Sequence, residues 1–142
     1  MPFGLFQPKT WFASGPVERT RAMVRMSNAR DYDGMGQAVT EDFLHLDTAG
    51  AAIKGREAFL VALRELHRQA DDLKIETDDV FEQDEDVLIR GRLVSTNPDY
   101  CSESLWRVRF ADDGRVSEIQ AFRENNQISI ARLTAHLRRK PS

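Results

Sequence analysis

The hydrophobic period of the sequence changes near residue 70, and this change restricts the possible folds more than any other feature. Before it, apolar side chains recur at helical spacing, most clearly where Phe59, Leu63 and Leu66 share one face of a helix predicted over 56–70. After it, apolar and polar residues alternate, as they do in strands that bury one face. The alternating segments are 73–77, 87–95, 104–110 and 116–123. Because short turns join these segments, an antiparallel meander is predicted for the second half of the chain.

The first half of the chain is predicted to hold two more helices and one short strand. Ser14, Gly15 and Pro16 are typical of a helix start, with the serine hydroxyl as cap and proline in the first turn. Asp33 is expected to cap a second, shorter helix. The predicted segments are helices over 17–31 and 33–39, a strand over 43–47, a loop over 48–55 and, after the meander, an amphipathic helix from residue 128. Helices first and sheet last predict an α+β fold, in which helices cover one face of a curved, mainly antiparallel sheet.

The length of 142 residues fits one domain. We predict an N-terminal arm over 1–16, a folded domain over 17–127, and a C-terminal helix and tail over 128–142. The arm is rich in aromatic side chains, among them Trp11 and Phe12. Such side chains are expected to pack on their own domain or on a second subunit. The alternative is that the arm is a lid over a pocket.

Composition and charge exclude several classes of function. The net charge is −3 and the arginines are scattered among acids, so a nucleic-acid partner is not expected. No apolar run approaches the roughly 20 residues that a membrane span requires, and the N-terminal segment lacks the pattern of a secretory signal. Cys101 is the only cysteine, which rules out an intramolecular disulfide and favours a reducing, cytoplasmic location.

The sequence predicts neither a metal nor a cofactor. No base lies near Cys101, so we interpret it as an inert thiol rather than a nucleophile. His45 and Asp47 could offer two metal ligands, but His67 is expected on a distant helix and His136 near the tail. No cluster has a recognised ligand spacing, and no glycine-rich phosphate loop or serine elbow is present.

Three stretches of the sequence resemble a known superfamily. The segment NARDYDGMGQAVTEDFLHLDTAG (28–50) is similar to the corresponding part of the ketosteroid isomerases, which belong to the nuclear-transport-factor-2-like (NTF2-like) or SnoaL-like superfamily. IKGREAFLVAL (53–63) resembles its glycine-led third helix, and WRVRFADDGRVSEIQAFRENNQI (106–128) its last hairpin. The resemblance implies a cone-shaped, cystatin-like fold. It implies little about chemistry, because the superfamily includes isomerases, dehydratases, cyclases, epoxide hydrolases and proteins with no known catalysis.

The resemblance places Asp47 at the position of the family's general base. In ketosteroid isomerase, a worked example of this chemistry, an aspartate base acts with an oxyanion hole made by a tyrosine and a protonated aspartate. Here Met23 stands at the tyrosine position and Trp106 at that of the second aspartate. Losing one oxyanion donor costs on the order of 10²–10³ in rate, so steroid isomerase activity is not expected.

Strand alternation predicts the pocket independently of the resemblance. His45 and Asp47 lie on one face of their strand, and both are candidate catalytic residues, His45 as general acid or orienting group. The residues expected to bind the substrate are Trp106, Arg123, Phe59, Leu63, Val108 and Phe110, with Val87, Ile89 and Leu93 as further apolar walls. Two arrangements of Asp47 remain open: a base that hydrogen-bonds His45 or the substrate, or a structural partner of Arg123.

Two functions follow as hypotheses. The first is an acid–base enzyme of the isomerase, dehydratase or cyclase type, acting on an apolar or carbonyl-containing organic ligand with Asp47 as base. The second is a non-catalytic ligand-binding or dimerisation module of the same fold. Charged side chains on the opposite sheet face predict a homodimer through the convex face. They are Arg90, Arg92, Arg107, Arg109 and Glu118.

Overall fold

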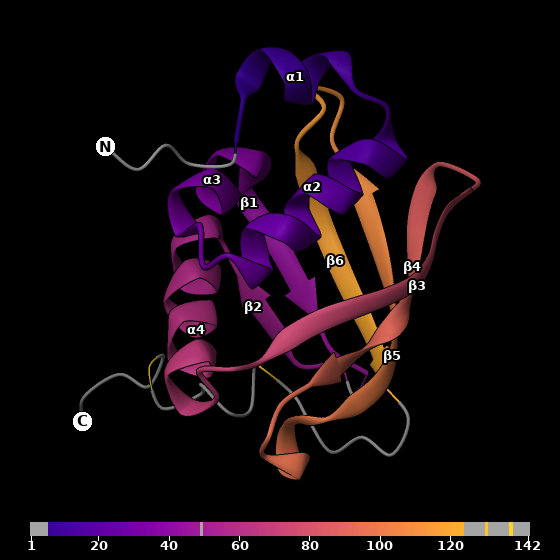
Figure 1. Ribbon diagram of the computed structural model, residues 1–142. Coiled ribbons are helices and arrows are strands. Elements are labelled where there is room, and N and C mark those ends of the chain that lie inside the picture. The colour runs from indigo at the N-terminus through magenta and orange to yellow at the C-terminus, as the bar shows by residue number, and fades with distance from the viewer. Residues whose placement is uncertain (1–5, 49, 124–129, 131–136, 138–142) are drawn as a thin grey trace.

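The computed structural model describes residues 6–48, 50–123, 130 and 137, in which helices pack against one face of a strongly curved sheet (Figure 1). The predicted α+β class is confirmed. The helices are α1 (Pro8–Ala13), α2 (Pro16–Asn28), α3 (Tyr32–Ala38), α4 (Arg56–Gln69) and the 3₁₀ turn η1 (Pro98–Tyr100). The strands are β1 (Val39–Leu46), β2 (Ala52–Lys54), β3 (Lys74–Gln83), β4 (Asp86–Val94), β5 (Ser102–Phe110) and β6 (Val116–Arg123). None of the described helices is long and apolar enough to cross a membrane.

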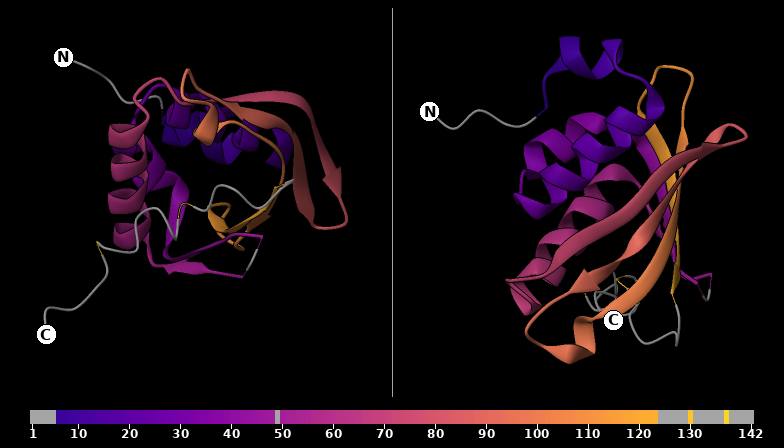
Figure 2. Two further views of the ribbon diagram at one scale, coloured as in Figure 1. Left: turned by 90° about the horizontal axis from the view of Figure 1, so that it is seen from below. Right: turned by 45° about the vertical axis from the view of Figure 1, so that its right-hand side comes forward.

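The sheet has six strands in the order β2-β1-β6-β5-β4-β3. Neighbouring strands are antiparallel except β1 and β6, which run parallel, with His45 opposite Ile119. The predicted meander is therefore β3 to β6, and β1 joins its last strand. Figure 2 shows that the sheet is curved and that its concave side faces α2 and α4. The concave face of the sheet and these helices enclose the core.

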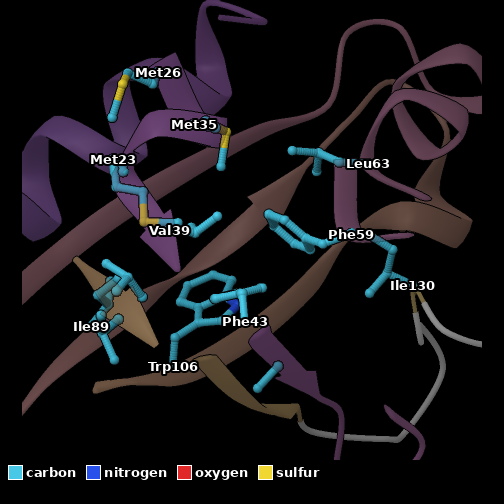
Figure 3. Close-up of a cluster of buried hydrophobic side chains, with 14 of the residues drawn as sticks. Met23, Met26, Met35, Val39, Phe43, Phe59, Leu63, Ile89, Trp106 and Ile130 are labelled. Atoms are coloured by element: carbon cyan, nitrogen blue, oxygen red, sulfur yellow. The ribbon is translucent and has the colours of Figure 1, made fainter. Parts of the chain in front are cut away.

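Side chains from both layers meet in that core. Met23 of α2 shares the core with Phe59 and Leu63 of α4 and Trp106 of β5 (Figure 3). Met26 of α2 lies apart from these side chains, with its sulfur beside Gly34 of α3. Each of these five side chains is buried. The apolar stripe at helical spacing and the alternate apolar positions of the strands thus form one hydrophobic cluster.

Both predicted caps in the first half of the chain are wrong, for a local reason. Helix α2 begins at Pro16 as expected, but Gly15 is its N-cap, and the Ser14 hydroxyl donates instead to the Thr10 carbonyl of α1, at 2.6 Å. Helix α3 is capped by Asp31, whose Oδ1 accepts from the Gly34 N–H at 3.0 Å, two residues earlier than predicted. The cap of α2 therefore lies one residue later than predicted, because the Ser14 hydroxyl is used by α1, and the cap of α3 lies two residues earlier.

Two strands extend beyond their predicted limits, and one was not predicted. Strand β1 begins at Val39, directly after α3, and β2 lies within the predicted loop over 48–55. Strand β3 continues to Gln83 along the sheet edge. Near the register shift at 77–79, β3 and β4 approach each other closely. A Cβ atom at Gly91 of β4 would clash there with the backbone carbonyl of Glu76 in β3. Only glycine fits that crossing.

The described part of the N-terminal arm, from residue 6 onward, packs on its own domain, which is one of the expected arrangements. Phe6 and Trp11 are buried, and the Trp11 indole N–H donates to the Gly114 carbonyl in the β5–β6 turn at 3.1 Å. Arg19 of α2 donates to the same carbonyl at 3.1 Å. Helices α1 and α2 are therefore both hydrogen-bonded to the turn of the β5–β6 hairpin. The C-terminal helix predicted over 128–142 lies outside the described residues, apart from Ile130 and Leu137.

Candidate functional site

A mainly apolar cavity lies between α2, α4 and the concave face of the sheet. About 100 Å³ of it can be reached by the centre of a water molecule, several times the roughly 10–15 Å³ that one water needs on the same measure. The residues that line it include Thr20, Met23, Ser27, Met35, His45, Phe59, Leu63, Leu66, His67, Leu73, Ile75, Ile89, Leu93, Trp106, Val108, Ile119, Arg123 and Ile130. Its wall is thus apolar with a few polar groups, the common composition of small-molecule pockets.

The structure brings most of the predicted site residues together in this wall. His45, Trp106, Arg123, Phe59, Leu63 and Val108 all line the cavity, as do Ile89 and Leu93. Asp47, Phe110 and Val87 are not among the described residues that line it. Phe110 follows a register shift at the end of β5, and its ring lies under the Arg19 guanidinium at 5.3 Å. The prediction that Phe110 and Val87 line the cavity is therefore wrong. Alternation shows which face of a strand a side chain lies on, but not whether that part of the strand reaches the cavity.

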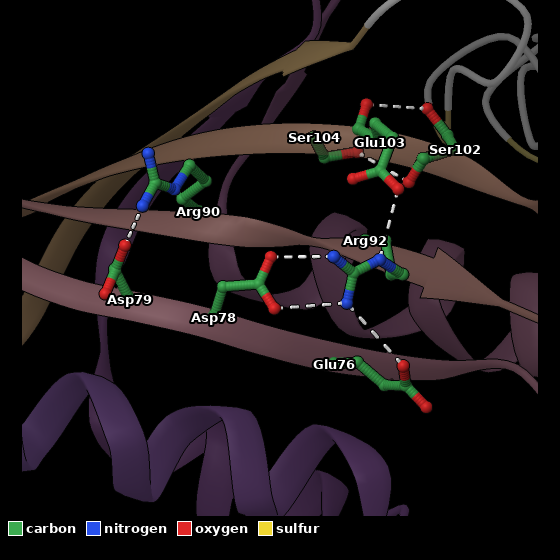
Figure 4. A network of polar contacts seen from close by, with 8 residues as sticks. All are labelled: Glu76, Asp78, Asp79, Arg90, Arg92, Ser102, Glu103 and Ser104. Carbon is green, nitrogen blue, oxygen red and sulfur yellow. Dashed lines mark hydrogen bonds and ion pairs between the residues drawn. The ribbon is translucent and has the colours of Figure 1, made fainter.

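The arginine-bearing face of the sheet points away from the cavity, as the alternation predicts. Each arginine there pairs with an acid of its own chain. Arg92 contacts Asp78 of β3 and Glu103 of β5, and Arg90 contacts Asp79 (Figure 4). Further along, Arg107 pairs with Glu118 at 2.7 Å, and Arg109 pairs with Asp86 at 3.1 Å.

His45 of β1 is a neutral imidazole in the cavity wall. Its side chain is 6% exposed and its ring stacks on that of Phe59, with 5.8 Å between centroids. Among the described residues, none hydrogen-bonds its Nδ1. Burial and, to a smaller extent, the nearby Arg123 lower the pKa of His45 to about 3, while Asp47 acts in the opposite sense. Since that pKa lies well below 7, the ring carries no charge at neutral pH.

Asp47 and Arg123 lie beside His45, where β1 and β6 end. Asp47 is 1% exposed, and its Oδ1 accepts from the Ala51 N–H at 2.9 Å, which closes the turn into β2. Arg123 is 9% exposed; burial lowers its pKa to about 10, against the opposing effect of Asp47. Thr48 joins the two strands, since its hydroxyl donates to Ala121 O at 3.2 Å and accepts from Arg123 N at 2.8 Å. Arg123 therefore stays cationic at neutral pH, in an apolar wall.

The sequence reasoning missed a second histidine in the wall. His67, in the last turn of α4, is 7% exposed and lines the same cavity as His45, so it is not remote from it. Its Nδ1 lies 2.8 Å from the hydroxyl of Tyr32 in α3. Burial lowers the pKa of His67 to about 4, with a smaller contribution from Arg30. Helical spacing carries the signal that could have found it, because His67 follows Leu63 by four residues and so shares its face.

Within the described part of the chain, no group of three or more histidine, cysteine or acidic side chains could hold a metal ion. The chemistry that the described wall offers is hydrogen bonding and charge, from the basic side chains of Arg123 and Lys74 and two neutral imidazoles, set in apolar surface. Such a wall suits an organic ligand with one or two oxygen atoms.

Comparison with known proteins agrees with this architecture. The profile of the SnoaL-like domain matches residues 20–119, which is most of the chain. The chain belongs to the SnoaL-like domain family. The matched region runs from α2 into β6 and so includes both layers around the cavity. No curated protein matches the sequence significantly.

Solved structures similar to this SnoaL-like domain share its fold at low sequence identity. A SnoaL-like protein of unknown function from Burkholderia thailandensis E264 has a TM-score of 0.67 and 20% identity, over 78% of this chain and 95% of that one. A candidate SnoaL-like polyketide cyclase from Jannaschia sp. CCS1 has a TM-score of 0.68 and 17% identity, over 84% and 90%. A computationally designed 17-OHP binder has a TM-score of 0.66 and 14% identity, over 80% and 94%. At these identities the likeness concerns the fold alone, which confirms the expected NTF2-like, cystatin-like architecture.

Proposed function

We propose that this SnoaL-like domain binds a small, mainly apolar organic molecule that carries a carbonyl oxygen, and that it moves a proton on that molecule. The reaction type is that of an isomerase, dehydratase or cyclase. The observation that carries the proposal is the composition of the cavity wall, in which Arg123 and His45 are set in apolar surface. The names of similar structures, a candidate polyketide cyclase and a designed 17-OHP binder, are consistent with an organic ligand in a cavity of this fold.

Each polar group has a role that follows from its charge. Arg123 remains cationic at neutral pH and would bind the carbonyl oxygen, stabilising the enolate that forms when a neighbouring carbon loses a proton. His45 is neutral and would contact the ligand, so it can accept a proton. Asp47 raises the pKa of His45, and the proposed base is this pair, with Asp47 supplying the negative charge that stabilises the protonated ring. Trp106 and Phe59 would hold the ligand by apolar contact.

A second function, binding without catalysis, is supported by a specific observation. The pKa of His45, about 3, is low for a base working near pH 7. In addition, Met23 and Trp106 stand where ketosteroid isomerases carry oxyanion donors, and Met23 cannot donate a hydrogen bond. A binding module would use the same cavity and the same cation without needing a base.

One experiment separates the two functions. Native mass spectrometry of the purified protein identifies the bound ligand, and turnover of that compound is then measured for Asp47→Asn and for the control Asp42→Asn, an exposed position on β1, the strand that directly precedes Asp47. An enzyme requires that Asp47→Asn abolish turnover, while ligand affinity changes by less than about tenfold and the control stays active. If turnover persists in Asp47→Asn and only the melting temperature falls, Asp47 is structural and the acid–base proposal fails.

We further propose a cytoplasmic homodimer that pairs the convex sheet faces of two copies. The pairs Arg107–Glu118 and Arg109–Asp86 leave these groups part-exposed, so they can exchange partners across a two-fold axis. Such contacts fix register more than they add affinity. Sedimentation at modest salt and tens of micromolar protein should then give a dimer mass, and a monomer under those conditions contradicts the proposal.

A further inference from the structure

His67 is a polar group in the cavity wall for which the proposed function has no role. It comes from α4, whereas Arg123 and His45 come from the sheet, so the two walls of the cavity each carry polar groups. Its only hydrogen bond in the described chain joins Nδ1 to the Tyr32 hydroxyl, at 2.8 Å. The Nε2 atom on the other side of the ring has no hydrogen-bond partner among the described residues. Because His67 lines the cavity, this nitrogen is placed to hydrogen-bond a molecule bound there.

The surroundings of Tyr32 determine which partner donates in the Tyr32–His67 hydrogen bond. Burial raises the pKa of Tyr32 above its ordinary value, so the phenol keeps its proton at neutral pH. No other acceptor for this hydroxyl is found in the part of the chain that the structure describes. The Arg64 guanidinium lies over the Tyr32 ring at 5.0 Å, and its positive charge draws electron density from the phenol, which strengthens the O–H as a donor. Tyr32 therefore donates, and the lone pair of His67 Nδ1 accepts.

This assignment fixes the tautomer of His67. Because the pKa of His67 is lowered to about 4, the ring is neutral near pH 7 and carries a single N–H. With Nδ1 acting as acceptor, that hydrogen is on Nε2. The ring is thus a donor with one defined orientation, set by α3 and independent of His45.

We propose that the Nε2–H of His67, oriented by Tyr32, is a fixed hydrogen-bond donor to an acceptor oxygen of the bound ligand. This inference rests on the proposed function and narrows its substrate class: the ligand presents a carbonyl or ether oxygen to α4, not a hydroxyl or amine hydrogen. His67 thereby supplies from the helical wall a neutral donor of the kind that Met23 cannot supply. A neutral imidazole donor of this type is known to polarise a carbonyl group.

The tautomer is tested first, because that measurement needs no ligand. Two-bond ¹H–¹⁵N spectra at pH 7 should show His67 with its proton on Nε2 and its lone pair on Nδ1. In Tyr32→Phe, which keeps the ring and removes the hydroxyl, both tautomers should become populated. A proton found on Nδ1 of the unmodified protein overturns the inference.

The donor role is then tested with a matched pair of probes. Acetophenone and α-methylstyrene have nearly the same shape, but only acetophenone has a carbonyl oxygen. We expect the wild-type protein to prefer acetophenone by about tenfold, the usual effect of one hydrogen bond. The preference should fall below about twofold in His67→Leu. His67→Gln, whose amide can donate, should restore part of it.

The outcomes distinguish this inference from the proposed function. Equal binding of both probes by the wild-type protein, or a preference that persists in His67→Leu, overturns the role of His67 and leaves ligand binding in place. Failure of both probes to bind counts against the proposed function and against this inference with it. Circular dichroism spectra of Tyr32→Phe, His67→Gln and His67→Leu establish that each variant is folded before its affinity is compared.

Discussion

Mild acid should destabilise this fold through His45. The pKa of His45 is lowered from 6.5 to about 3 by burial and by the charge of Arg123. Between these two pH values the unfolded chain binds a proton at this residue and the folded chain does not. The free energy of unfolding therefore decreases as pH falls through this window, and the stabilisation is fully present only above pH 6.5.

The size of the effect follows from the width of the window. A single histidine contributes about 1.4 kcal/mol per pH unit between its unfolded and folded pKa values. Lowering the pH from 6.0 to 4.5 should thus remove about 2 kcal/mol through His45 alone. His67 acts in the same direction, because burial lowers its pKa to about 4. The depressed pKa of Asp72, about 2, affects stability only below this range. The range from pH 6.0 to 4.5 therefore reports mainly on the histidines.

Urea denaturation at several pH values measures this dependence. Trp11 and Trp106 are both buried, so their fluorescence follows unfolding. In His45→Gln the curve of unfolding free energy against pH should be shallower by about 1.4 kcal/mol per pH unit. Cys101→Ser, a substitution at an exposed position that leaves every histidine in place, serves as the control and should keep the wild-type slope. A wild-type curve that is flat between pH 6.0 and 4.5, or a His45 pKa near 6.5 by NMR, would refute the argument.

Three further predictions concern stability. Gly91→Ala should lower the free energy of unfolding by at least 3 kcal/mol or prevent folding, since its Cβ meets the backbone of β3, as chemical denaturation would show. Gly15→Ala, with no atom near its Cβ, should change the free energy of unfolding by less than about 1 kcal/mol in the same assay. Trp11→Phe removes one hydrogen bond to the β5–β6 turn and should cost about 1 kcal/mol in thermal denaturation, whereas the exposed Phe12→Leu should cost less.

The elements that the sequence predicts best are those with a strong internal period. Helix α4 was predicted over 56–70 and spans Arg56–Gln69, because its apolar stripe continues without interruption. Strand β3 was predicted to end near 77 but continues to Gln83, through Asp78 and Asp79. Those two acids interrupt the alternation of apolar and polar residues. In the fold they pair with Arg92 and Arg90 of β4, and such cross-strand pairing is invisible to a local pattern.

The sequence predicts which side chains face the candidate site, but not which of them lie within contact of one another. Alternation and helical spacing place His45, Trp106 and Arg123 toward the concave side, and all three line the cavity. The position of Asp47, in the turn beneath that wall, depends on its bond to Ala51, which directly precedes β2. That strand has three residues and is too short to leave a period in the sequence. The Tyr32–His67 hydrogen bond depends on the packing of α3 against α4, which no local pattern gives.

The parallel pairing of β1 with β6 has a consequence for how the chain folds during synthesis. Val39 and Leu46 of β1 pair with Val116 and Gln120, across more than half of the sequence. Closing a loop of this length costs conformational entropy before the strands make any stabilising contact. This pairing is therefore expected to form late in folding. On the ribosome, β1 lacks this neighbour until the last strand has left the exit tunnel. The cavity wall that contains His45 and Arg123 is thus completed only by β6, and a nascent chain that stops before this strand lacks that wall.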